Sequence, residues 1–143
     1  MFRYACKIVR VVDGDTVDVD IDLGFGIWIH NERIRIHGID APESRTRDLE
    51  EKKCGILATE FVESMLKVGS TYTLVTEKVG DKGKFGRVLG KFEVYDHKTD
   101  STMFLGDIMI RDHYAVAYPG ESKEQIEEQH LINREKLRNL GLI

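Results

Sequence analysis

Acidic residues gather at a point of the sequence where metal-assisted chemistry could take place. Asp13 and Asp15 flank Gly14 at an expected turn, and three more aspartates follow, up to Asp22. Ca²⁺ prefers clustered hard oxygen ligands, so this segment could form half of a calcium site. A polar hairpin turn with solvated aspartates would give the same pattern. An EF-hand is excluded, because an isoleucine, Ile29, stands where its bidentate glutamate would be.

A second acidic pair follows a strand-like segment in which Arg35 alternates with apolar residues. The segment runs on to Asp40 and Glu43, on either side of Pro42. Proline fixes the backbone that follows Ala41 and would hold the two carboxylates in a defined relation. The alternative is an ordinary charged strand end at the protein surface.

A basic loop with two glycines leads to Arg87 and carries Lys82 and Lys84. Guanidinium groups bind phosphate bidentately and stay charged at any working pH. A solvated hairpin with exposed lysines would also explain this loop. The region 67–91 holds six Lys and Arg residues against two acidic ones, beside the acidic region 13–22. This uneven distribution predicts an acidic pocket next to a basic lip, as a metal-assisted site for phosphate chemistry needs.

The composition is typical of one globular domain, residues 1–143. Apolar residues make up 41% of the chain, and the net charge of −4 argues against a protein that coats nucleic acid. No apolar run approaches the roughly 18 residues needed to span a bilayer, so we expect no membrane partner. The N-terminus shows no export signal, which favours an intracellular and possibly phage-encoded protein, and a monomer is the default expectation. Cys6 and Cys54 fit no metal-ligand pattern and are expected to be reduced core thiols.

The elements that would position these residues follow from periodicity. Alternation and turn residues predict five strands, and spacing of three and four predicts helices. The expected strands cover 4–12, 17–21, 27–36, 71–77 and 87–95, and the helices cover 48–68, 105–111 and a segment from Ser122, with a turn over 96–102. This order predicts an α+β fold, a five-stranded OB-fold β-barrel with three helices.

Taken together, the three segments resemble the staphylococcal nuclease (thermonuclease-like) family in both order and spacing. The matching strings are VDGDTV at 12–17, Arg35 with IDAPE at 39–43, and FGR at 85–87, and EQHL at 128–131 agrees in the last helix. The resemblance extends over nearly the whole chain and implies the same OB-fold.

The resemblance also implies a role for individual residues. Asp15, Asp40 and the backbone carbonyl of Ala41 would bind Ca²⁺, and Asp13 would lie next to this site. Glu43 would activate or orient the attacking water, and Arg35 and Arg87 would hold the phosphate. Family members often carry threonine in place of Ala41, so we expect a weakened metal site.

The resemblance further implies how substrate is bound. Tyr114 and Tyr118 lie in the region where nucleotide bases rest on tyrosines, and Lys82 and Lys84 would contact the substrate. The implied activity is calcium-dependent endonuclease cleavage of single-stranded or melted DNA and of RNA, which leaves 3′-phosphate products. The alternative is a catalytically weak module of the same fold that binds nucleic acid or protein. A calcium-binding structural protein would leave Arg35 and Arg87 unexplained.

Overall fold

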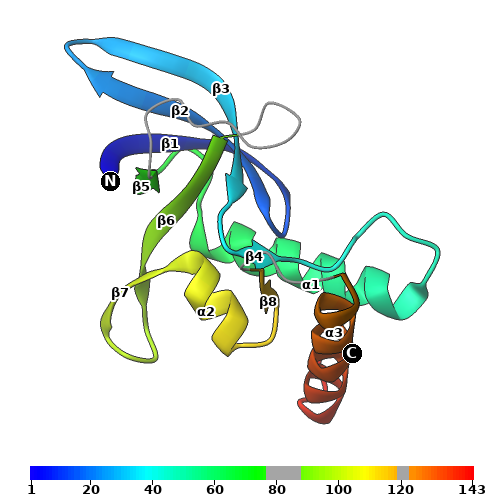
Figure 1. Cartoon of the computed structure of the whole chain (residues 1–143). Coiled ribbons are helices and arrows are strands. Elements are labelled where there is room, and N and C mark those ends of the chain that lie inside the picture. Colours follow the sequence, from blue (N-terminus) through cyan, green and yellow to red (C-terminus); the bar gives the residue numbers. More distant parts are fainter. Residues whose placement is uncertain (77–87, 119–122) are drawn as a thin grey trace.

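Five strands pair edge to edge into a closed barrel, which forms the body of the protein (Figure 1). The computed structural model describes residues 1–76, 88–118 and 123–143. The barrel strands are β1 (Phe2–Asp13), β2 (Thr16–Gly24), β3 (Ile27–Ile36), β5 (Thr71–Thr76) and β6 (Val88–Asp96). Parallel pairing of β3 with β6 closes the barrel, while the other neighbours pair antiparallel. The α+β fold with a five-stranded barrel is confirmed.

Strict alternation explains how β2 lies in the barrel wall. Val17, Val19 and Ile21 are buried in the core. The intervening aspartates point outward, where Asp18 accepts hydrogen bonds from the guanidinium of Arg33 at 2.9 and 3.2 Å. The predicted pocket of five aspartates therefore divides, because Asp18, Asp20 and Asp22 lie along the outer face of β2.

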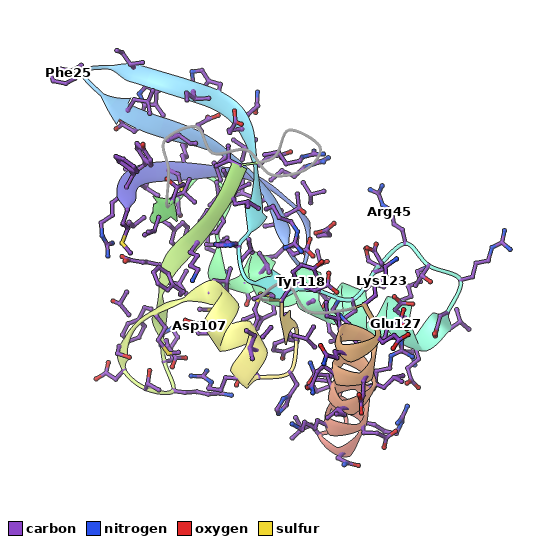
Figure 2. All side chains as sticks on the ribbon, viewed as in Figure 1. Phe25, Arg45, Asp107, Tyr118, Lys123 and Glu127 are labelled. Carbon is purple, nitrogen blue, oxygen red and sulfur yellow. The ribbon has the colours of Figure 1, made fainter. Side chains whose placement is uncertain are left out.

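Beyond the barrel, β2 and β3 continue as a long hairpin (Figure 1). Its tip is Phe25, which is fully exposed (Figure 2). Gly24 and Gly26 on either side have φ values of 82° and 77°, which glycine adopts without steric cost.

Three short strands that the sequence did not predict add to this frame. They are β4 (Ile39–Asp40), β7 (Ser101–Phe104) and β8 (Val116–Ala117). The expected turn over 96–102 is too long, because β7 begins at Ser101 and pairs with β6. The turn is tight because the Asp96 carboxylate accepts hydrogen bonds from the backbone N–H and the hydroxyl of Thr99.

The described residues form three helices, as expected: α1 (Leu49–Met65), α2 (Leu105–Arg111) and α3 (Lys123–Asn139). Asp48 caps α1 by accepting from the backbone N–H groups of Glu50 and Glu51. The helix ends at Met65, before the predicted limit at residue 68. The capping box expected at Ser122 lies outside the described residues. None of the three helices is long and apolar enough to cross a membrane.

In Figure 1, α1 lies across the lower end of the barrel, α2 packs beside β6 and β7, and α3 projects away from the body. The buried face of α1 includes Cys54, Ala58 and Val62. Cys54 and Cys6 are both buried and free, which confirms the expectation of reduced core thiols. Burial raises the pKa of the Cys6 thiol to about 12.

Candidate active site

An open cleft of about 870 Å³ lies between the end of β3, the loop that follows β4, and α3. Five of the predicted site residues line it: Arg35, Asp40, Ala41, Glu43 and Tyr118. Tyr118, Lys123 and Glu127 line the same cleft, and Figure 2 shows them gathered where α3 begins. The cleft is therefore the place to test the predicted chemistry.

Asp15 lies at the base of this region, in the turn between β1 and β2. One carboxylate oxygen accepts from the Thr16 hydroxyl at 3.0 Å, and the other accepts from the Ala41 backbone N–H at 3.3 Å. Asp13 accepts from the Asp15 backbone N–H at 3.0 Å, which shapes the turn. Burial raises the pKa of the Asp15 carboxyl to about 6, while the charge of Arg35 opposes the rise and Asp13 adds to it.

The acidic turn packs tightly because it contains glycine. A Cβ on Gly14 would lie 2.7 Å from the Ala58 Cβ on α1 and 2.9 Å from the Ala41 Cβ. Neither distance is possible for a real side chain, so only glycine allows the turn to approach both. The three small residues Gly14, Ala41 and Ala58 thus bring Asp15 next to the segment that carries Asp40.

Arg35 connects the two acidic segments. Its guanidinium donates to the carbonyl oxygens of Ile36 and Ile39, both at 2.8 Å. The Nη2 atom also lies 3.5 Å from Asp15 Oδ2 and 3.8 Å from Asp40 Oδ1. Two carboxylates that are 25 residues apart in the chain therefore face a single nitrogen.

Asp40 has a partner that the sequence analysis did not assign. His130 Nε2 lies 2.7 Å from Asp40 Oδ2, so the imidazole of α3 hydrogen-bonds the carboxylate. The sequence signals were its place in the EQHL string at 128–131 and on an apolar helix face with Ile126 and Leu137, at helical spacing. That spacing indicates which face packs on the body, but not that it meets an acidic site.

Glu43 is exposed and lines the cleft. Its backbone lies directly against α1, since a Cβ on Gly55 would come within 2.6 Å of the Glu43 carbonyl carbon and oxygen and of the Ser44 nitrogen. Glycine at this position lets the loop lie on the helix, and the helix in turn fixes where the Glu43 side chain starts.

The structure does not bring every predicted residue to the cleft. Tyr114 stacks on Phe61, with ring centroids 4.5 Å apart, and packs against the core, whereas Tyr118 lines the cleft. The predicted Lys82, Lys84 and Arg87 lie outside the described residues.

The carboxylate and carbonyl oxygens of Asp15, Asp40 and Ala41 are donors that suit a hard divalent cation such as calcium. Within the described ranges, no group of three or more His, Cys, Asp or Glu side chains is placed to hold a metal ion. The expected ligand set contains only two carboxylates, with a backbone carbonyl and water, so this result does not conflict with it. Arg35 is the arginine that faces both Asp15 and Asp40, and burial raises the pKa of the Asp15 carboxyl in spite of this charge. A divalent cation would supply the missing positive charge.

Comparison with known proteins identifies the family to which the chain is similar. Residues 33–138 match the family model described as staphylococcal nuclease homologue. An uncharacterized protein of Methanocaldococcus jannaschii is 24% identical over 156 residues, which cover 98% of this chain and 72% of that protein. The protein ParB of Escherichia coli is 33% identical over 84 residues, which cover 59% of this chain and 38% of ParB.

Proposed function

Because the chain belongs to the staphylococcal nuclease family, we propose that it is a calcium-dependent nuclease that hydrolyses phosphodiester bonds by attack of water on phosphorus. The observation that carries the proposal is the convergence of Asp15 and Asp40 on the guanidinium of Arg35, beside a cleft that Glu43 lines. Fold alone would not support an activity, whereas acidic and cationic groups in one cleft do.

Each residue has a distinct proposed role. Asp15, Asp40 and the Ala41 carbonyl would hold Ca²⁺, which would supply positive charge to the phosphate when bound. Glu43 accepts a proton from the attacking water or orients it, for which an exposed carboxylate in the cleft is suited. Arg35 binds the phosphate oxygens and stabilises the charge that builds on them in the transition state.

Arg87 is proposed as the second phosphate ligand. A guanidinium does not give up a proton readily, so Arg87 would stabilise the leaving oxygen electrostatically rather than protonate it. Lys82 and Lys84 would attract the substrate backbone.

The proposed substrate is single-stranded or locally melted DNA and RNA, cut internally to leave 3′-phosphate ends. Tyr118 is 44% exposed at the cleft, so its ring is available for a base to stack on. Stacking on an aromatic side chain contributes about 1–3 kcal/mol per base and tolerates any sequence. Tyr114 has its ring face on Phe61, so it is the weaker candidate for this role.

One observation favours the alternative, a binding module with little catalysis. Two of the N–H groups of Arg35 already donate to the carbonyls of Ile36 and Ile39, which leaves fewer of them for a phosphate. Such a module would bind nucleic acid without cutting it.

The test is to incubate the protein with heat-denatured DNA and with RNA, in calcium and in EDTA. We expect cleavage in calcium only, and a loss of about a hundredfold or more in Glu43→Gln, since a positioned general base contributes 10²–10⁴-fold. Asp22→Asn, on the outer face of β2, is the matched control and should cut normally. Tight binding of uncut nucleic acid by the wild-type protein would support the module and overturn the nuclease proposal.

A further inference from the structure

We propose that His130 is the positioning residue for Asp40 and that it makes α3 part of the calcium-binding unit. The inference rests on the proposed function, because it assumes that Asp40 binds the metal. It adds a residue from the last helix, some 90 positions from Asp40 in the chain, to a calcium site whose proposed ligands all lie in the N-terminal half.

The two oxygens of Asp40 have different neighbours. Oδ2 lies 2.7 Å from His130 Nε2, while Oδ1 faces Arg35 Nη2 at 3.8 Å. The backbone of Asp40 belongs to a strand of only two residues, which pairs with the equally short β8. This two-residue pairing fixes the Cα of Asp40 but leaves its side-chain torsions free. The hydrogen bond with the His130 imidazole is therefore the contact that fixes the orientation of the carboxylate.

The position of His130 is in turn set by how α3 packs on the body. Ile126 and Leu137, on the same helix face, are buried at 6% and 1% exposure. Asn133 donates from Nδ2 to the Ala115 carbonyl at 3.1 Å, and Arg134 pairs with Asp48 at 3.4 Å. The buried Ile126 and Leu137 come before and after His130 along the helix, so it is their packing that holds its ring against Asp40.

The burial of His130 indicates that it is not there for stability alone. Its side chain is 15% exposed, and the buried Nδ1 finds no hydrogen-bond partner among the described residues. A shielded polar atom without a partner destabilises the folded protein. A residue that carries this cost while it hydrogen-bonds a site carboxylate is best explained by what it does for that carboxylate.

The contact also predicts a reciprocal effect. If the docked helix favours calcium binding through His130, calcium must favour the docked helix to the same extent, because coupling between two binding events is symmetric. Calcium should therefore protect the backbone amides of α3 from hydrogen exchange.

The experiment compares the wild-type protein with His130→Ala, His130→Gln and Asn133→Ala by calorimetric titration with calcium. Loss of the contact in His130→Ala should weaken calcium binding about tenfold or more. Gln places an amide N–H near the position of Nε2, so His130→Gln should recover most of the affinity. Asn133→Ala removes a docking hydrogen bond of the same helix without touching Asp40, so it should bind calcium like the wild type.

Hydrogen exchange supplies a readout that does not depend on cleavage. Calcium should slow exchange in α3 of the wild type and of Asn133→Ala, but not in α3 of His130→Ala. Equal calcium affinity in the wild type and His130→Ala would overturn the inference, as would an equal loss in Asn133→Ala, which would trace the effect to helix docking. A wild-type protein that binds no calcium would instead overturn the proposed function, and this inference with it.

Discussion

Arg35 lies beside Asp15 because the strands that carry them are in a fixed register. Thr16, the residue after Asp15, is directly opposite Arg35 in the β2–β3 pairing, and the Ile36 N–H donates to the Asp15 carbonyl at 2.8 Å. The 3.5 Å approach of Arg35 Nη2 to the Asp15 carboxylate thus follows from backbone hydrogen bonds. Because a register slip would turn Arg35 to the other face of the sheet, the barrel itself enforces this part of the site.

Asp15→Asn should stabilise the calcium-free protein at pH 7 while it weakens calcium binding. Burial raises the pKa of Asp15 to about 6, above its value in the unfolded chain, so the ionised form destabilises the folded state at neutral pH. Removing the charge should raise the free energy of unfolding by roughly 3 kcal/mol, as about two pKa units imply. Urea unfolding in EDTA measures this, and calcium titration measures the loss of affinity.

Asp22→Asn is the control for that substitution, because Asp22 is on the same strand face as Asp18 and accepts from the Gly24 N–H, which Asn can also do. Its stability should change by less than about 0.5 kcal/mol. A destabilised Asp15→Asn protein would mean that the charge of Asp15 is well compensated, contrary to the burial of its carboxylate.

Arg35→Lys should abolish most cleavage although it keeps the positive charge. Lysine cannot donate to the carbonyls of Ile36 and Ile39 and face two carboxylates at once, because it lacks the planar guanidinium. We expect cleavage of denatured DNA to fall on the order of 10²–10³-fold, as for the loss of other transition-state donors. Initial rates of DNA cleavage at saturating calcium measure this loss.

Arg33→Lys is the matched control for Arg35, since Arg33 lies two residues earlier on β3 and pairs with Asp18 on the outer face. It should cut at close to the wild-type rate. Similar losses in both variants would show that any replacement of arginine by lysine on β3 impairs cleavage, and would contradict a specific role for Arg35.

The sequence predicted the barrel because each strand has a strong local pattern. The alternation of Val17, Val19 and Ile21 with aspartates specifies one buried and one solvated face, and the structure agrees. β7 was missed because its polar residues read as a turn, whereas its pairing with β6 depends on contacts that Asp96 makes with Arg111 and Thr99.

The site was predicted less completely, for a physical reason. The pairing of Asp15 with Arg35 follows from strands that are neighbours in sequence. The contact of His130 with Asp40 requires knowing how α3 docks, which no local pattern specifies. The same holds for Gly55, which reads as a weak helix residue until the backbone of Glu43 is seen against it.

Acid should destabilise the protein partly through Asp96. Hydrogen bonds from Arg111 and Thr99 hold the pKa of this carboxyl well below its usual range. A group with a lowered folded pKa stabilises the protein above its unfolded pKa, near 4, and this contribution is lost as the pH falls further. Asp96→Asn should therefore lower the melting temperature at pH 7, and the difference from the wild type should shrink below about pH 4.

Thermal unfolding followed from pH 7 to pH 2.5 measures this effect. Asp107→Asn, which changes an exposed carboxylate on α2, should change the melting temperature only slightly, without the pH dependence expected of Asp96→Asn. A difference in melting temperature between Asp96→Asn and the wild type that stays constant at every pH would contradict the stabilising role of ionised Asp96.

Gly55→Ala should reduce both stability and cleavage, against the usual effect of this substitution. In an ordinary helix interior, alanine is more favourable than glycine by about 1 kcal/mol. Here the new Cβ would lie 2.6 Å from backbone atoms of Glu43 and Ser44, so the loop that carries Glu43 must shift. We expect a net destabilisation of about 1–3 kcal/mol, typical of overpacking, and a loss of cleavage of about a hundredfold from misplacing the general base.

Glu60→Ala, an exposed position on the same helix, should leave both properties close to those of the wild type. If Gly55→Ala were more stable than the wild type and fully active, the loop would tolerate the displacement, and α1 would not be what positions Glu43.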